Sequence, residues 1–147
     1  MKLEGEVTIQ ADRQKVWDFL TDPEVVSQCA PGLESMTIIE PGKQFEATAA
    51  IGFGTVKVRF SNVINWVEMD APNFAKMAAH GTAPGSAADV TGEMKLEDAV
   101  DGGTLMAWSA DVMVSGTIAS LASRMMGSAS KKIAKSFFDC VKGYLEE

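Results

Sequence analysis

The stretch TLMAWSADVMVSGTIASLASRMMGSASKKIAKSFFDCVKGYL, residues 104–145, decides the fold because its hydrophobic period changes in the middle. Up to residue 114, apolar residues alternate with more polar ones, which is typical of a half-buried strand. After Ser115-Gly116 the apolar residues recur at steps of three and four, as far as Leu145. This second pattern predicts one amphipathic helix of about thirty residues, roughly 40 Å long.

Several segments before this stretch also alternate apolar and polar residues. They cover residues 2–10, 45–53, 56–61, 74–81 and 87–96, with turn signals at 52–54, 70–73 and 101–104. Short turns between consecutive strands favour antiparallel hairpins. The chain therefore reads as one strand, two short helices, about six antiparallel strands and one long helix, an α+β layout with helices on one face of the sheet.

The short helices follow the first strand. Residues 11–20 have helical spacing, and DPEVVSQCAPG at 22–32 starts a second helix that is stopped after barely two turns. Asp22 can cap its N-terminus, and Pro23 fits the first helical position. Pro31 disfavours helix at the residue before it, and Gly32 permits a sharp exit. Such a short, interrupted helix adds little to a core.

Composition sets limits on the function. The chain has 147 residues, of which 46% are hydrophobic, and we expect a single domain over residues 1–147. It contains no apolar run long enough to span a bilayer and no secretory signal pattern. A net charge of −7 argues against nucleic-acid binding. Cys29 and Cys140 lack metal or redox spacing, so we expect two reduced thiols in a cytoplasmic protein.

The charge is unevenly distributed. Residues 116–147 carry five basic and three acidic side chains, so this segment has a net charge of +2 and the remainder has −9. A basic helix on an acidic body predicts either contact with an anionic membrane or an acidic partner through Lys131, Lys132 and Lys135, or a solvated helix face.

No catalytic motif is evident. His80 is the only histidine, no nucleophile elbow is present, and neither metal-ligand spacing nor a phosphate-binding loop occurs. We therefore predict no catalytic residues, no metal and no cofactor. Strand parity places Arg59 on the outer face. An inward Arg59 or His80 beside a carboxylate would instead favour an enzyme.

The inner face of the predicted sheet carries many small residues, such as Ala47, Ala49, Gly92 and Ala110. Small residues under a helix can leave an apolar cavity for a ligand. They can equally let helix and sheet pack closely. The residues alone leave both alternatives open.

Two segments resemble a known family. VWDFLTDPEVVSQCAPGLESM, residues 16–36, resembles the segment after the first strand of helix-grip proteins in the START-like, SRPBCC superfamily. Residues 103–141 resemble, more specifically, the CoxG family of carbon monoxide dehydrogenase subunits. The matching residues are Gly103-Thr104, Trp108, Ala110, Val112, Gly116, Ile118-Ala119-Ser120-Leu121 and Phe137-Phe138.

This resemblance implies a helix-grip (Bet v 1-like) fold, in which a seven-stranded antiparallel sheet wraps around the long helix and encloses an apolar cavity. It implies that the short helices cover one end of the cavity as a lid. It also implies an accessory role beside a CO dehydrogenase-type molybdenum enzyme, its membrane and a lipophilic quinone. Family members can carry a C-terminal membrane anchor, whereas this chain stops at Glu147. Peripheral contact at the inner face of the membrane is therefore the expected substitute.

We predict a non-catalytic carrier of a lipophilic small molecule, quinone or isoprenoid-like. The residues expected to line the cavity are Phe60, Val90, Met94, Met106, Trp108, Ala110, Val112, Met125, Ala129, Ile133 and Phe137, with Val26, Pro31 and Leu33 at the lid. Two other functions remain open. One is an enzyme like the polyketide cyclases and aromatases of related folds, and the other is a docking module without a ligand.

Overall fold

The computed structural model describes residues 1–146, within which the chain forms seven strands and a long C-terminal helix. The strands are β1 (Lys2–Ile9), β2 (Leu33–Glu40), β3 (Gln44–Phe53), β4 (Val56–Asp70), β5 (Phe74–Ala83), β6 (Ser86–Asp98) and β7 (Thr104–Gly116). The helices are α1 (Arg13–Thr21), α2 (Pro23–Val26), the 3-10 helix η1 (Ser27–Cys29) and α3 (Ala119–Leu145). Glu147, the end of the predicted domain, lies outside the described residues.

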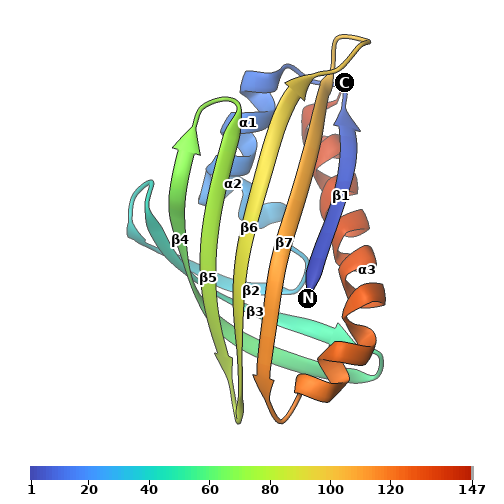
Figure 1. The fold of residues 1–147 in the computed structure, drawn as a ribbon. Coiled ribbons are helices and arrows are strands. Elements are labelled where there is room, and N and C mark those ends of the chain that lie inside the picture. Colours follow the sequence, from blue (N-terminus) through green and yellow to red (C-terminus); the bar gives the residue numbers. More distant parts are fainter. Residues whose placement is uncertain (147) are drawn as a thin grey trace.

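The strands form one antiparallel sheet in the order β1-β7-β6-β5-β4-β3-β2. The sheet is strongly curved, so that β2 and β3 run across behind β5, β6 and β7 (Figure 1). Helix α3 lies beside β1 on the concave side, and α1 and α2 cover the same side near the C-terminal end of α3 (Figure 1). The predicted architecture of a curved antiparallel sheet around a long helix is therefore confirmed.

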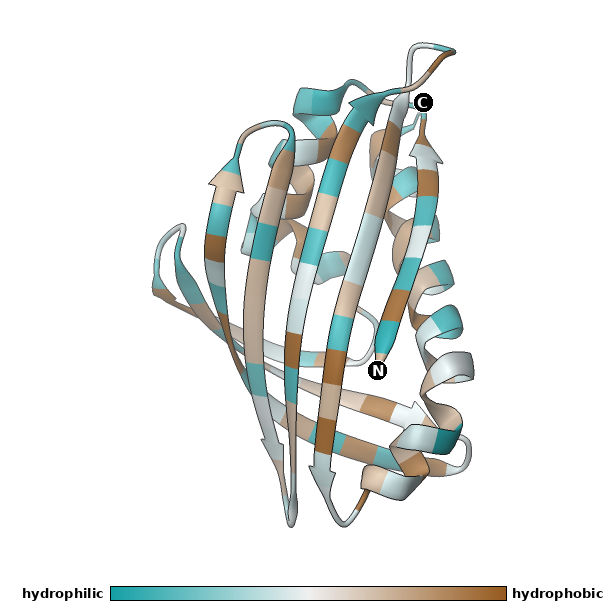
Figure 2. Ribbon diagram, viewed as in Figure 1, coloured by the Kyte–Doolittle hydropathy of each residue, from teal (hydrophilic) through white to brown (hydrophobic). Residues whose placement is uncertain are grey.

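Alternation along the strands separates a cavity face from a solvent face. In the pairing of β6 with β7, Met94 lies opposite Trp108 and Gly92 opposite Ala110, and all four residues line the space between sheet and helices. The next pair along these strands, Thr91 and Asp111, alternates with the inner set and is not part of the cavity lining. Figure 2 shows the resulting alternating bands along the central strands.

Two clusters of buried side chains fill the ends of the space between sheet and helices. The first, called the helix-end cluster, joins α1 to the C-terminal part of α3. It contains Ile9, Val16, Trp17, Phe19, Leu20, Cys29, Ala75, Leu96, Met106 and Val141. The hairpin cluster contains Phe53, Val58, Phe60, Ala122 and Ala129, and it joins the β3–β4 hairpin to the first half of α3. These two clusters therefore close the ends of the space between the sheet and the helices.

Strand β2 was not predicted at its position. Its sequence LESMTIIE does not alternate cleanly, and its pairing with β3 is interrupted by register shifts at Leu33/Ser35 and Ile38/Glu40. It is also an edge strand, where irregular pairing is common. The other strands and the long helix lie close to where the sequence pattern places them, except that β4 continues to Asp70, well beyond the predicted end at residue 61.

Candidate functional site: an apolar cavity under a short lid

A cavity of about 460 Å³ lies between the concave face of the sheet and the helices. Its volume falls within the range of roughly 300–1,000 Å³ that is usual for small-molecule sites. The apolar lining residues are Leu20, Pro23, Val26, Ala30, Leu33, Met36, Phe45, Ala47, Ala49, Ile64, Trp66, Ala75, Met77, Val90, Gly92, Met94, Met106, Trp108, Ala110 and Phe137. Ser27, Glu93 and Ser109 are the remaining lining residues. The site is therefore suited to an apolar ligand.

Small residues at the centre of the sheet create this space. Ala47 and Ala49 on β3 and Ala110 on β7 supply only methyl groups, and Gly92 supplies none. The neighbouring clusters hold the helices off the sheet at both ends, so helix and sheet cannot collapse onto the small residues. The sequence left open an apolar cavity or close packing of helix on sheet, and the structure shows the cavity.

Six of the residues predicted to line this cavity do so: Val90, Met94, Met106, Trp108, Ala110 and Phe137. Their use in ligand binding stays a prediction. Five others lie elsewhere. Phe60, Met125 and Ala129 belong to or pack against the hairpin cluster. Val112 is paired with Val90 but is not part of the lining.

The remaining predicted residue on α3, Ile133, lines a smaller side pocket of about 280 Å³ together with Met125, Ala129 and Pro31. The amphipathic period of α3 identified its buried face correctly, but not where that face leaves the sheet. The first half of the helix packs directly on the β3–β4 hairpin, so Phe137 is the α3 residue that reaches the main cavity.

Sequence reasoning missed several lining residues on the other strands. Met36, Phe45, Ile64, Trp66 and Met77 all lie on inner-face positions of β2 to β5. Strand alternation already placed Phe45, Ala47 and Ala49 on one face. The apolar, alanine-rich sequence of β5, FAKMAAHGTA, gave no clear indication of its inner face.

The predicted lid corresponds to α2, η1 and the loop that follows, and of its predicted residues Val26 and Leu33 line the cavity. Pro31 lies in the side pocket instead. Asp22 Oδ1 accepts a hydrogen bond of 3.0 Å from the backbone N–H of Glu24, which caps the helix as the sequence predicts. Gly32 has φ +76° and approaches the Ala50 carbonyl so closely that a side chain there would collide with it.

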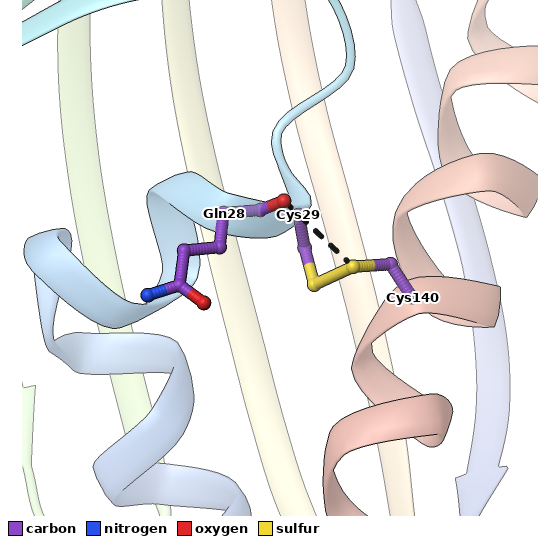
Figure 3. Close-up of a disulfide and its surroundings, with 3 residues drawn as sticks. All are labelled: Gln28, Cys29 and Cys140. Carbon is purple, nitrogen blue, oxygen red and sulfur yellow. Dashed lines mark hydrogen bonds between the residues drawn. A yellow bond between two sulfur atoms is a disulfide. The ribbon is translucent and has the colours of Figure 1, made fainter.

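A disulfide joins Cys29 of η1 to Cys140 of α3, with a Cα–Cα distance of 5.5 Å (Figure 3). The prediction of two reduced, separate thiols is therefore wrong. The two residues are 111 positions apart, and spacing patterns indicate only cysteine pairs that are close in sequence. Because the two cysteines are bonded, they give no support to the expected cytoplasmic location. Cys140 Sγ also lies 3.9 Å from the carbonyl oxygen of Gln28, a contact without a hydrogen bond because a disulfide sulfur carries no hydrogen.

Charged groups pair on the outside of the sheet. His80 Nδ1 lies 2.6 Å from Asp89 Oδ1, and both side chains are exposed. Arg59 donates to Glu34, with 2.9 Å between Nη2 and Oε2, and this hydrogen bond lowers the pKa of Glu34. Neither pair includes a residue of the cavity lining.

One polar atom near the cavity has no partner among the described residues. Trp66 Nε1 is buried in the cavity wall and makes no hydrogen bond. A buried donor without an acceptor is rare in folded proteins and destabilises them.

The basic residues predicted for membrane or partner contact lie on the solvent side of α3. Lys131, Lys132 and Lys135 are exposed. Lys135 Nζ lies 2.7 Å from Asp139 Oδ2, and this hydrogen bond raises the pKa of Lys135. Lys132 borders the side pocket. Within residues 1–146, no helix has the length and apolar character needed to cross a bilayer.

Residues 5–146 match the family model of the carbon monoxide dehydrogenase subunit CoxG. This match covers nearly the whole chain, so it includes the strands, the lid segment and the long helix together. No curated protein sequence matches the chain.

Among solved structures, a conserved protein from Geobacillus kaustophilus is similar over 98% of this chain and 94% of its own, with 23% identity and a TM-score of 0.89. The Zhui aromatase/cyclase from Streptomyces sp. R1128 is similar over 98% and 92%, with 16% identity and a TM-score of 0.74. Ara h 8.0201 is similar over 98% and 96%, with 20% identity and a TM-score of 0.69. These likenesses show a shared helix-grip fold.

Proposed function

Because the chain belongs to the CoxG family of carbon monoxide dehydrogenase subunits, we propose that it is a non-catalytic accessory protein that binds and carries a lipophilic small molecule. The observation that carries this proposal is the cavity of about 460 Å³, whose wall is apolar at almost every position. The family's association with CO dehydrogenase-type molybdenum enzymes supports a quinone or isoprenoid-like compound as the ligand.

Desolvation would supply the affinity. Each buried methylene contributes about 0.8 kcal/mol, so a tail of about twelve carbons would contribute roughly 10 kcal/mol. Association itself costs at least about 4 kcal/mol, which leaves roughly 6 kcal/mol, a Kd of tens of micromolar. Tighter binding requires that the ligand fills more of the cavity, so ligands that match its volume should bind best.

The exposed lysines of α3 support a membrane or partner contact. Lys131 and Lys132 make no ion pair among the described residues, so their charges are available to anionic lipid headgroups or to an acidic surface on a partner enzyme. A carrier that docks through α3 could exchange a lipophilic ligand with the membrane.

The enzyme alternative has less support. Both charged pairs that include the candidate acid–base residues, His80 with Asp89 and Arg59 with Glu34, lie on the solvent side of the sheet. A general acid or base must lie within hydrogen-bond reach of the substrate, and neither pair lines the cavity. A closely packed core would favour the docking alternative. The cavity between the middle of the sheet and the helices therefore counts against it.

Native mass spectrometry tests the proposal. The purified protein is measured as isolated and after incubation with a short-tailed menaquinone, and the bound material is extracted into organic solvent and identified. We expect a lipophilic adduct that is retained in the native state and released on denaturation. A mass equal to the apo chain, before and after incubation with quinone and with lipids, would contradict the carrier.

A further inference from the structure

The lid segment, residues 23–31, is held in place by very few buried groups. None of the α2 residues is buried, and Cys29 is the one residue of the segment with an exposed fraction as low as 5%. Pro23, Val26, Ser27 and Ala30 nevertheless line the cavity. The lid therefore closes the cavity with half-buried side chains rather than with a core of its own.

Hydrogen bonds do not attach the lid segment to the rest of the fold. Across the part of the chain that the structure describes, the hydrogen bonds of residues 23–31 end on residues between 22 and 33. The neighbouring Gly32 carbonyl accepts a hydrogen bond of 2.9 Å from Ala50 N–H, which fixes only the exit of the segment. The disulfide to Cys140 is the strongest connection of the lid to α3.

The position of this disulfide places it at the edge of the cavity. Cys140 lies one turn after Phe137, the α3 residue that lines the cavity, and Cys29 lies between the lining residues Ser27 and Ala30. Figure 3 shows the bond passing directly from η1 to the helix. Opening the lid away from α3 therefore requires that this bond is broken or that the helix moves with it.

We propose that Cys29 and Cys140 form a reversible redox site, whose reduction by a dithiol releases the lid and allows ligand exchange. This inference rests on the proposed carrier function, because it concerns the entry and exit of the same ligand. In the oxidised state the lid is tethered and ligand is retained. In the reduced state the segment is held by partly exposed apolar contacts and by one buried residue, Cys29, and short elements of this kind open readily.

The exchange chemistry balances with a dithiol as the reductant. One thiolate of the dithiol attacks Sγ of Cys140, which is only partly buried, and forms a mixed disulfide as the Cys29–Cys140 bond breaks. Cys29 leaves as a thiolate and takes up a proton. The second thiol of the dithiol then displaces Cys140, so that two electrons and two protons pass from the dithiol to the two cysteines.

The experiment measures release of the fluorescent probe anilinonaphthalene sulfonate by stopped flow, from the full chain with and without dithiothreitol. Alkylation and mass measurement count the free thiols in each sample. Reduction should accelerate release about tenfold or more, because the tether no longer holds the lid against the helix. The control is the double variant Cys29→Ser/Cys140→Ser, which should release the probe quickly in both conditions.

Amide hydrogen exchange of residues 23–31 provides a second measurement that does not need a ligand. Exchange should be faster in the reduced wild type than in the oxidised one. Equal rates of probe release and of hydrogen exchange in the two states would overturn the redox site, as would two free thiols in protein prepared without reductant. A probe that never binds, with exchange that still depends on reduction, would instead count against the carrier function alone.

Discussion

Filling the cavity from β7 is the sharpest test of the ligand site. Ala110 lines the cavity and is paired with Gly92, which has no side chain, so an Ala110→Trp indole can extend over open space at the centre of the sheet. An indole that buries about 150 Å² of apolar wall would remove roughly 4 kcal/mol of ligand burial at about 25 cal/mol per Å². This loss should raise the Kd several-hundred-fold, and by a factor of about 1,000 at most.

Isothermal titration calorimetry with a short-tailed menaquinone measures this loss, and urea unfolding checks that the variant is folded. The free energy of unfolding should change by less than about 2 kcal/mol, because the indole fills space rather than displacing packed side chains. The matched control is Met113→Trp on the same strand, where the side chain is 72% exposed and the Kd should not change. If Ala110→Trp binds the quinone within about threefold of wild type, a difference well below the loss worked out above, the ligand site is not this cavity.

Four further substitutions test the packing and charges of the fold. Trp66→Phe removes the unpartnered indole N–H and should leave the free energy of unfolding unchanged or raise it by about 1 kcal/mol in urea titrations, whereas a loss above about 2 kcal/mol would indicate a partner for this group. Gly116→Ala should destabilise the protein by more than about 1 kcal/mol, because Gly116 has φ +92°. Gly127→Ala lies inside α3 with no neighbour near the Cβ position, so it should stabilise the protein by about 0.5–1 kcal/mol. Equal Tm values for the two variants would contradict this expectation. Glu34 has a pKa below 4.5 in the folded protein because Arg59 donates to it, so its stabilisation is present above pH 4.5 and is lost as the pH falls through the lowered pKa. The Tm difference between wild type and Glu34→Gln should therefore narrow below pH 4.5, and a difference that grows on acidification would be the wrong sign.

The disulfide gives the interrupted helix at 22–32 a role that its sequence did not explain. A segment that contributes one buried residue to the core is joined to the helix that the sheet surrounds. Four of its residues line the cavity, and its attachment to α3 is covalent. The same arrangement explains why so short an element keeps a defined position.

Much of the fold followed from the sequence alone. The change from a period of two to steps of three and four after Ser115-Gly116 predicted β7 and α3 with nearly their observed bounds. Alternation on β6 and β7 assigned the inner positions, and Arg59 lies on the outer face as its parity predicted. These properties are local, because each follows from the spacing of residues within one element.

The tertiary structure decided which residues of different elements pack against each other. Phe60, Met125 and Ala129 are on the predicted inner faces, yet they pack against each other in the hairpin cluster, while Phe45 and Ile64 face the cavity. Periodicity shows which side of an element is buried but not where along its length another element covers it. The pairing of Cys29 with Cys140, 111 residues apart, depends on how α3 lies across the sheet. That position is set by the packing of both end clusters together, which no single segment of the sequence contains.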